Sequence, residues 1–354
     1  MQKLTFHLLA LPHTQVTEEY FSCAYSAKVH GFTRMMRSLG HTVYLYAGEE
    51  TTADPSELIT CISEEQRAEA VGNNHYTSAS FDTNLPHWQI FNGNAIKEIA
   101  KRIKPKDFIL IIAGTAQKEI ADAFPSHINC EWGIGYSGTF SKFKVYESNT
   151  WRAACSAQWK NAASADVNLF DTVINGYFDP EIFSMELKKE DYYVYLGRMT
   201  QRKGVDIAAE ACKAAGVKLI FAGSGGYIPS YGEYIGSVDS DKRKALLGKA
   251  IASFSPTIYL EPFCNSHIES LACGTPVIST DFGIFTETIQ NGFNGQRCNT
   301  LSEFVQAIES VKKLDPREIA TDAYVNYSMD VIRYKYDRYF NRLMTLWGSG
   351  WYQL

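Results

Sequence analysis

Short, almost continuously apolar runs alternate with helix-like segments from the start of the chain. Residues 4–11 form the first run and residues 42–47 the next. Between them, residues 25–39 carry apolar side chains at helical spacing, and Gly40 suits the end of a helix. Strands that are apolar on both faces are typical of parallel sheets covered by helices. The chain therefore begins with a predicted β-α-β unit and a doubly wound α/β fold.

The same alternation continues along the chain, which at 354 residues is long enough for two domains. Further strands are expected at 108–113, 129–134, 165–169, 171–174, 192–196, 217–222 and 277–279, and further helices at 63–70, 94–104, 117–123, 151–159, 205–215, 241–251, 284–290 and 330–347. The charged residues 188–191 suit a linker, so we place the boundary near residue 185, between domains 1–184 and 185–329.

Composition excludes several classes of protein. The net charge of −5 and the pI near 5.9 give no overall basic character for nucleic acid or anionic membranes. The eight cysteines are scattered without C-x-x-C or zinc-ligand spacing, which indicates reduced thiols and a cytoplasmic protein. The apolar run at the N-terminus is too short for a signal peptide, and no window reaches the length of a transmembrane helix.

Two carboxylates stand out in the stretch 257–279. Residues 257–260 are expected to form a strand, and Glu261 follows it. Ser266 and Glu269 have capping-box spacing at the start of a helix that Gly274 ends. Ligands of open α/β sheets bind at the carboxyl ends of strands, where both acids would lie. The alternative is that Glu269 only caps its helix and that Glu261 is a solvated loop acid.

Residues 197–204 place three cations, Arg198, Arg202 and Lys203, between a strand and the N-terminus of a helix. Cations are unfavourable there because the N-terminus of a helix is its positive end. A bound anion would relieve the conflict, so the turn is a candidate phosphate site. The alternative is a solvated basic loop.

These two stretches resemble a known family. Glu261 and Glu269 have E-x7-E spacing, residues 272–278 read A-x-G-x-P-V-I, and residues 197–204 read G-R-x-x-x-x-K-G. This resembles the retaining glycosyltransferases of the GT4 type, in the glycosyl transferases group 1 family. The resemblance implies a GT-B fold, with two Rossmann-like domains facing a central cleft and the helix 330–347 joining the first. Residues 175–183 also resemble the family's N-G-x-D-x-x-x-F element, with one extra residue.

The resemblance assigns roles to residues of the second domain. Arg198 and Lys203 would hold the donor diphosphate, Glu261 the transferred sugar and Glu269 the ribose, with Glu261, Arg198 and Lys203 as the catalytic set. Cys264 stands where the family usually has Gly, which affects the sugar pocket. The predicted donor-binding residues are Gly197, Arg198, Lys203, Gly223, Ser237, Val238, Glu261, Asn265, Ser266, His267, Ile268 and Glu269.

The first domain resembles the family only in architecture. Residues 12–14, Pro-His-Thr, replace the family's Gly-Gly loop, and no histidine follows the strand 108–113. The predicted acceptor-side residues are His13, Thr14, His87, Gly114, Thr115, Glu131 and Tyr136.

The expected function is transfer of a sugar, with retention and without a metal or other cofactor, from a nucleoside diphosphate sugar to an acceptor hydroxyl. Two alternatives remain, a nucleotide-sugar epimerase-like enzyme and a non-catalytic nucleotide-sugar-binding protein. A dinucleotide fingerprint is disfavoured because Ile228 takes the place of its third glycine. The acceptor stays open between a glycan, a lipid-linked sugar, a metabolite, a protein and a modified nucleic-acid base.

Overall fold

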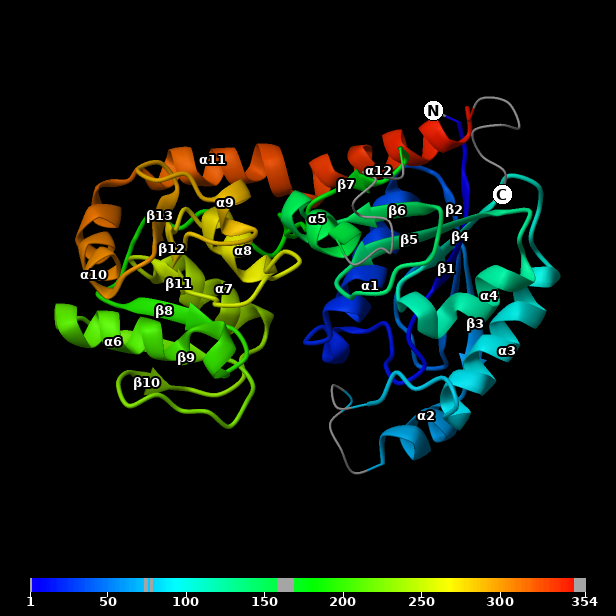
Figure 1. The fold of residues 1–354 in the computed structure, drawn as a ribbon, viewed down its shortest axis with the longest axis horizontal. Helices are drawn as coiled ribbons and strands as arrows, with labels where there is room; N and C mark the ends of the chain where they lie inside the picture. Colours follow the sequence, from blue (N-terminus) through cyan, green and yellow to red (C-terminus); the bar gives the residue numbers. More distant parts are fainter. Residues whose placement is uncertain (1, 73–75, 77–78, 158–168, 347–354) are drawn as a thin grey trace. The chain divides into compact units, whose positions relative to one another are not determined.

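The computed structural model describes residues 2–72, 76, 79–157 and 169–346, and it divides into two compact units (Figure 1). Unit 1 comprises Met1–Glu147, Ala154–Ile174 and Arg333–Leu354, and unit 2 comprises Ser148–Ala153 and Asn175–Ile332. The main division thus falls between Ile174 and Asn175, ahead of the linker predicted near residue 185. We describe each unit by itself.

Unit 1 contains a parallel sheet with the strand order β3-β2-β1-β4-β5-β6-β7. Its strands are β1 (Thr5–Leu9), β2 (Thr42–Gly48), β3 (Glu57–Ile62), β4 (Phe108–Ile111), β5 (Ile128–Ile134), β6 (Phe143–Tyr146) and β7 (Thr172–Val173). The other strands predicted in this half are confirmed, but the strand predicted at 165–169 is not: residues 165–168 lie outside the described residues, and Leu169 lies in a turn. The sequence did not predict β3 and β6, which carry polar residues among their apolar ones.

Helices cover both faces of this sheet. Its helical segments are η1 (Glu18–Tyr20), α1 (Ala24–Ser38), α2 (Glu64–Val71), α3 (Pro86–Ala100), η3 (Gly114–Gln117), α4 (Lys118–Ala123) and the end of α12 (Met329–Leu343). On one face, Phe6 of β1 contacts Phe32 of α1 and Phe340 of α12. On the other face, Leu9 shares a buried cluster with Phe91 of α3 and Ile120 of α4. Helix α3 begins at Pro86, earlier than residue 94, because proline is well accommodated in the first turn of a helix.

Unit 2 contains a second parallel sheet with the order β10-β9-β8-β11-β12-β13. Its strands are β8 (Tyr193–Leu196), β9 (Leu219–Ala222), β10 (Glu233–Tyr234), β11 (Ser253–Ser255), β12 (Val277–Thr280) and β13 (Gly295–Cys298). Its helical segments are η5 (Gln201–Lys203), α6 (Val205–Ala215), α7 (Ser240–Lys249), α8 (Asn265–Ala272), α9 (Phe285–Thr288), α10 (Leu301–Ser310), η6 (Val311–Lys313) and α11 (Pro316–Tyr327), while α5 (Asn149–Ala157) begins in unit 2 and ends in unit 1.

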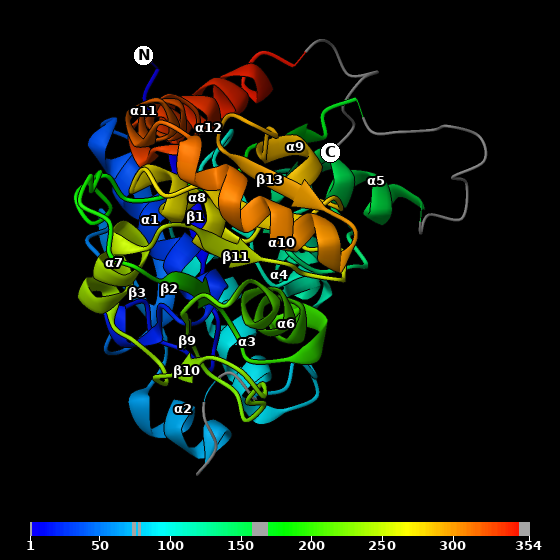
Figure 2. The same ribbon diagram turned by 90° about the vertical axis from the view of Figure 1, so that its left-hand side faces the viewer.

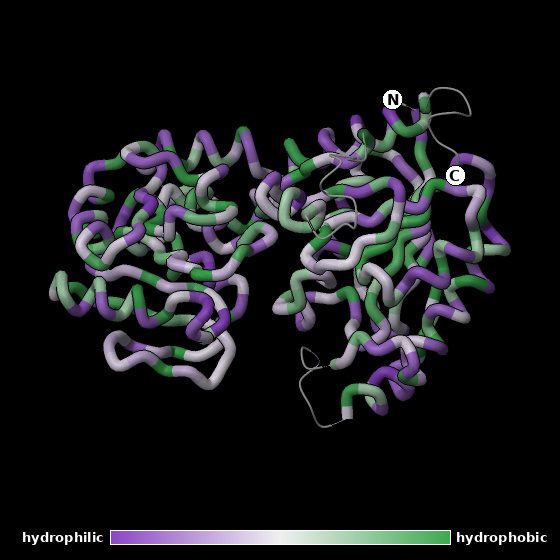
Figure 3. The backbone as a smooth tube through the Cα atoms, viewed as in Figure 1, coloured by the Kyte–Doolittle hydropathy of each residue, from purple (hydrophilic) through white to green (hydrophobic). Residues whose placement is uncertain are grey.

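Alternate residues of β8 separate two buried clusters of unit 2. Tyr193 and Tyr195 pack with residues of α6 and α10, which lie side by side in Figure 2. Val194 and Leu196 pack with residues of α7, α8 and α11. Figure 3 shows hydrophobic stretches along the central strands and mixed polarity along the covering helices. Unit 2 is thus a three-layer α/β domain, as the sequence predicted for each half of the chain.

The strand predicted at 257–260 is wrong. Strand β11 is Ser253–Ser255, and it pairs with β8 and β12. Pro256, which has no N–H, follows it directly, so the ladder ends there. Ile258 is 59% exposed, and Tyr259 lies beneath the guanidinium of Arg202 at 4.0 Å. Residues 257–260 therefore form a loop, which lengthens the connection from β11 to α8.

Candidate functional site

The two motif stretches of unit 2 meet at a switch point of its sheet. From β8, the chain proceeds to β9 on one side, whereas β11 pairs with β8 on the other side. Residues 197–204 follow the carboxyl end of β8, and Glu261 lies in the loop after β11. Connections leave in opposite directions at such a point, and ligands of open α/β sheets bind there.

Partly buried Lys203 and buried Glu261 form an ion pair at this position. Lys203 Nζ lies 2.7 Å from Glu261 Oε1, and the same oxygen accepts a hydrogen bond of 2.6 Å from the hydroxyl of Thr257. Burial lowers the pKa of Lys203, but the neighbouring Cys264, Glu261 and Tyr259 outweigh it and raise this pKa overall. Lys203 is therefore a permanent cation beside a carboxylate whose Oε2 has no hydrogen-bond partner among the described residues.

Glu269 is held by a residue that the sequence did not single out. Arg243 of α7 donates from Nε to Glu269 Oε2 at 2.6 Å, and its Nη2 contacts the same oxygen. The predicted capping box of Ser266 and Glu269 is wrong, since α8 begins at Asn265 and Cys264 at its N-cap makes no side-chain capping bond. Glu269 is buried, and its Oε1 accepts no hydrogen bond within the described part of the chain. No local pattern indicated Arg243, because it lies on another helix.

Three glycines from separate motifs meet at the ends of β8 and β9. Gly223 N–H donates to Gly236 O at 2.9 Å, and a Cβ on Gly223 would lie 1.8 Å from Gly197 O. Ser237 and Val238 follow directly, so the structure brings this predicted segment to the same edge of the sheet. Since Gly223 has a φ of 147°, glycine is required for both backbone conformation and space.

Arg198 and Arg202 differ in their surroundings. Arg198 is exposed, and its side chain makes no ion pair or hydrogen bond with any described residue, whereas Arg202 stacks on Tyr259. The backbone carbonyl of Arg198 accepts a hydrogen bond from the Tyr195 hydroxyl at 2.9 Å. This bond fixes the loop but leaves the Arg198 guanidinium exposed to solvent. Arg198 and Lys203 thus provide one accessible and one partly buried cation near Gly197.

The first turn of α8 contributes backbone groups rather than the side chains of His267 and Ile268, which are fully buried. The N–H groups of Asn265 and Ser266 donate to no residue that the structure describes, whereas His267 N–H donates to Cys264 O at 3.3 Å. Burial lowers the pKa of His267 to about 4, so its ring is neutral, and Nδ1 donates to Cys264 O at 2.5 Å. The N–H groups of Asn265 and Ser266 are therefore available to a ligand.

Cys264 has a φ of 77°, in the left-handed region that favours glycine. This explains why the related motif usually has Gly there. The Cys264 thiol lies 3.4 Å from the Ser266 hydroxyl, and burial raises its pKa to about 11, so it is protonated. Gly176 packs beside this loop, because a Cβ there would lie 2.3 Å from the Phe263 ring and 2.5 Å from Asn265 Oδ1.

In unit 1, the predicted residues His13, Thr14, Gly114 and Thr115 follow β1 and β4, which flank the corresponding switch point. Gln117 ties the two strand ends, since its Nε2 donates to Ala10 O at 2.8 Å and its Oε1 accepts from Ile112 and Ala113 N–H. The Thr14 hydroxyl accepts from Ser26 at 2.8 Å, and Thr115 is exposed.

His13 and His87 lie next to each other, with ring centroids 6.4 Å apart. Both are buried, and His13 Nδ1 and His87 Nε2 have no hydrogen-bond partner in the described residues. Burial, followed by His87 and Arg67, lowers the pKa of His13 to about 4, and burial lowers that of His87. The structure therefore brings together two neutral imidazoles.

Glu131 of β5 is fully buried, and its carboxylate is bonded to residues of the β5–β6 connection. Its Oε2 accepts from the N–H groups of Phe140 and Ser141 at 2.8 and 2.7 Å, and Oε1 accepts from the Tyr136 hydroxyl at 3.2 Å. Burial raises its pKa against the opposing effect of these hydrogen bonds. Both oxygens are engaged, which argues against the acceptor contact predicted for Glu131. Tyr136 packs against Gly114, where a Cβ would lie 2.5 Å from its ring.

The chain contains one D-x-D sequence at residues 239–241, Asp239–Ser240–Asp241. In the structure it starts a helix, since Asp239 accepts from Lys242 N–H at 2.8 Å as the N-cap of α7. Over the described ranges, no group of three or more His, Cys, Asp or Glu side chains could share a metal ion. No helix of these ranges has the length and hydrophobicity needed to span a membrane.

Part of the chain is similar in sequence to known glycosyltransferases. Residues 179–325 match the model of the family described as glycosyl transferases group 1. An uncharacterized glycosyltransferase of Methanocaldococcus jannaschii is 30% identical over 123 residues, 30% of this chain and 31% of that protein. Glycogen synthase of Mycobacterium tuberculosis is 30% identical over 122 residues, 30% of this chain and 29% of that protein. The chain thus spans less than a third of the length of these relatives.

Solved structures resemble the whole chain. Sucrose-phosphate synthase from Thermosynechococcus elongatus has a TM-score of 0.72 at 13% identity, covering 97% of this chain and 99% of that one. AviGT4, a glycosyltransferase of avilamycin A biosynthesis, has a TM-score of 0.69 at 17% identity, covering 96% and 98%. HepE of Anabaena, solved with UDP and glucose, has a TM-score of 0.64 at 12% identity, covering 97% and 100%. The predicted fold class, two Rossmann-like parallel-sheet domains, is confirmed.

Proposed function

We propose that this protein transfers a sugar from a nucleoside diphosphate sugar to an acceptor hydroxyl, with retention of configuration and without a required metal. The observation that carries the proposal is the ion pair of partly buried Lys203 and buried Glu261 at the switch point of unit 2. The match of residues 179–325 to a glycosyltransferase family supports it. HepE, a structural neighbour, was solved with UDP and glucose, which supports a donor of this class.

Each group of the site has a task in this reaction. Negative charge gathers on the diphosphate as the glycosidic bond breaks, and Arg198, Lys203 and the N–H groups of Asn265 and Ser266 stabilise it. Glu261 uses Oε1 to hold Lys203 and can accept from a sugar hydroxyl with Oε2. Glu269, oriented by Arg243, can accept from the ribose hydroxyls in the same manner.

Retention follows from front-face substitution, in which the acceptor hydroxyl attacks from the side that the diphosphate leaves. The leaving oxygen can take the acceptor proton, so the reaction needs no strong protein base. The nearby His267 is not needed as a base in this mechanism. Its ring is buried and neutral, and its Nδ1 donates a hydrogen bond to Cys264 O.

Thermal-shift titration with UDP-, GDP-, ADP- and dTDP-sugars in EDTA tests donor binding. A bound donor raises the apparent stability by mass action. We expect the sugars of one nucleotide to raise the Tm of the wild type. Arg198→Ala should weaken the affinity for that donor about 10- to 100-fold, the range for loss of a hydrogen bond to a charged group. Arg317→Ala, which removes an exposed arginine from the start of α11, is the matched control and should bind normally.

A shift that survives Arg198→Ala and Glu269→Gln, or no shift with any donor, contradicts the donor site. Catalysis is tested separately by NMR of the donor. Release of the nucleoside diphosphate, together with a sugar product that has the same anomeric configuration as the donor, supports retaining transfer. Epimerisation of the intact donor would instead support the epimerase-like alternative, and binding without any turnover the non-catalytic one.

A further inference from the structure

The segment that leads into β8 closes the ends of two helices of unit 2. Glu186 N–H donates at 3.1 Å to the carbonyl of Cys273, the residue at the C-cap of α8. Glu190 N–H donates at 2.7 Å to the carbonyl of Lys249, the last residue of α7. The last carbonyls of a helix have no partner within it, so this segment supplies donors that the two helices lack.

Lys189 belongs to the same segment and reaches both helix ends at once. Its Nζ donates to Gly248 O of α7 at 2.7 Å, to Cys273 O at 3.4 Å and to the Thr275 hydroxyl at 2.7 Å. The Thr275 hydroxyl in turn donates to Leu247 O of α7 at 2.7 Å. An ammonium has three N–H donors, and these contacts, which we call the Lys189 node, use all of them.

The Lys189 node lies one helical turn from the carboxylate predicted to hold the ribose. Cys273 follows Glu269 by four residues on α8, and its N–H donates to Glu269 O at 3.2 Å. Leu247 follows Arg243 by the same four residues on α7. Four residues of a helix rise by about 6 Å. Helices α7 and α8 are therefore joined at two adjacent levels, by the pair of Arg243 and Glu269 and by the node.

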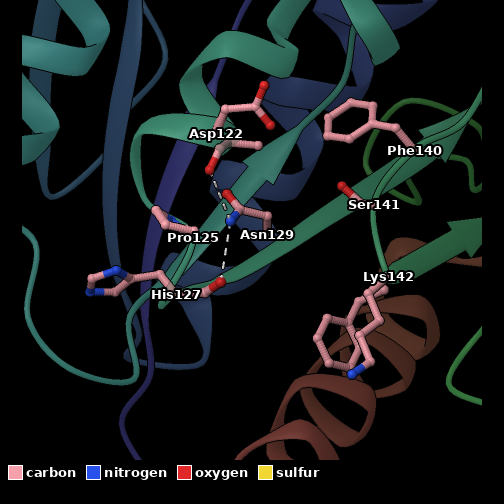
Figure 4. A pocket seen from close by; sticks show the side chains of 9 residues that line it. Asp122, Pro125, His127, Asn129, Phe140, Ser141 and Lys142 are labelled. Carbon is pink, nitrogen blue, oxygen red and sulfur yellow. Dashed lines mark hydrogen bonds between the residues drawn. The ribbon is translucent and has the colours of Figure 1, made fainter. Parts of the chain in front are cut away.

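Closing a helix end does not by itself require a charge. Figure 4 shows the neutral amide of Asn129 at a hollow of unit 1, where it donates to Ala121 O of α4 and to His127 O at 3.5 and 3.2 Å. Lys189 instead places an amine where burial lowers its pKa to about 8, because burial disfavours the charged form. A charge that is costly in this place favours a role beyond closing the helix ends.

We propose that Lys189 is a positioning residue for the nucleotide site. Helices α7 and α8 present their negative C-terminal ends to one ammonium, and without it these ends repel each other. The ammonium thus fixes the separation of the two helices, which keeps Arg243 within reach of Glu269 and the carboxylate directed at the ribose hydroxyls. This inference rests on the proposed function, since Glu269 meets a ribose only if the protein binds a nucleotide.

Isothermal titration of the full chain with UDP, GDP and ADP, and with the 2′-deoxy and 3′-deoxy forms of each, tests the inference. We expect the wild type to bind one ribonucleotide about 10-fold more tightly than a deoxy form, the effect of a hydrogen bond to a charged group. Lys189→Met keeps a side chain of similar length without the ammonium. It should weaken the ribonucleotide about 10-fold and leave the deoxy form within about 2-fold. Lys188→Met, at the exposed neighbouring lysine, is the matched control.

The preference for ribose separates positioning from stability, since a general loss of structure weakens both forms alike. Equal weakening of both forms, or a preference that Lys189→Met retains, overturns the inference while the donor site stands. If no nucleotide binds the wild type, or if it binds both forms equally, the donor site or its ribose contact fails, and the inference with it. If Lys189→Met does not fold in urea titrations, Thr275→Val replaces it, because it removes the hydroxyl between Lys189 and Leu247 O.

Discussion

Arg243 of α7 donates to Glu269 of α8, with Nε 2.6 Å from Oε2, across 26 positions of the sequence. The carboxylate is thus oriented by a cation of a neighbouring helix, and not by capping its own helix. Glu261 has the same design, since Lys203 and Thr257 hold one oxygen and leave the other for a ligand. In each case the protein supplies the direction of a carboxylate and leaves one acceptor unused.

Replacing Arg243 by Ala should lower the free energy of unfolding by about 1–3 kcal/mol, because it leaves a buried carboxylate without its partner. The same change should weaken nucleotide binding, since Glu269 loses its orientation. Urea denaturation and the donor titration measure these effects. Lys242→Ala removes an exposed cation from the same helix and should change neither quantity. If Arg243→Ala and Lys242→Ala had equal effects, the ion pair of Arg243 and Glu269 would not orient the carboxylate.

Replacing Cys264 by Gly should stabilise the protein by about 1 kcal/mol, because a left-handed conformation costs an L-residue about 1–2 kcal/mol and glycine almost nothing. Cys264→Ala is the control, since alanine keeps the strain at φ 77° and loses only the thiol. Urea unfolding of both variants separates backbone strain from thiol contacts. If alanine stabilises as much as glycine, the thiol and not the backbone is the source of strain.

Gly204 and Gly216 flank α6 with φ values of 72° and 69°, and they provide a matched pair. A Cβ on Gly204 would lie 1.9 Å from Pro256 O, whereas nothing lies within 4 Å of one on Gly216. Gly216→Ala should therefore cost about 1–2 kcal/mol for the conformation alone. Gly204→Ala should cost more than about 4 kcal/mol or prevent folding, since backbone must also move. Similar losses in urea unfolding would contradict the close approach.

His267 should make unit 2 less stable in acid. Its pKa in the folded protein is about 4, below the ordinary value of 6.5, so the unfolded chain binds a proton more readily. This contribution to stability is complete above pH 6.5 and is lost as the pH falls toward 4, by about 3 kcal/mol in total.

His267→Asn, whose amide can replace the Nδ1 donor to Cys264 O, should remove this part of the pH dependence. The free energy of unfolding measured between pH 7 and 4 gives the difference between variant and wild type. His13→Asn, which changes a histidine of similar pKa in unit 1, provides the comparison for the other unit. An unchanged slope in His267→Asn would mean that other groups cause the acid sensitivity.

Local sequence patterns were enough to predict most strands and the α/β class of this protein. Apolar runs predicted β1, β2, β4, β5, β8, β9 and β12, because strands buried on both faces must be apolar along their length. The turn at residues 197–204 also follows a local rule, since Gly204 has a φ of 72°, a conformation that favours glycine. The α/β class and the turn after β8 therefore followed from the sequence by itself.

Contacts between distant segments decided the rest. Residues 257–260 have a strand-like composition, but β11 ends before Pro256, so they have no strand to pair with. Glu269 has the spacing of a capping residue, yet Arg243 of another helix binds it. Glu131 is polar enough for a site, yet backbone N–H groups of the β5–β6 connection engage its carboxylate. A side chain's role at these positions depends on which backbone and charges surround it, and only the tertiary structure brings those groups together.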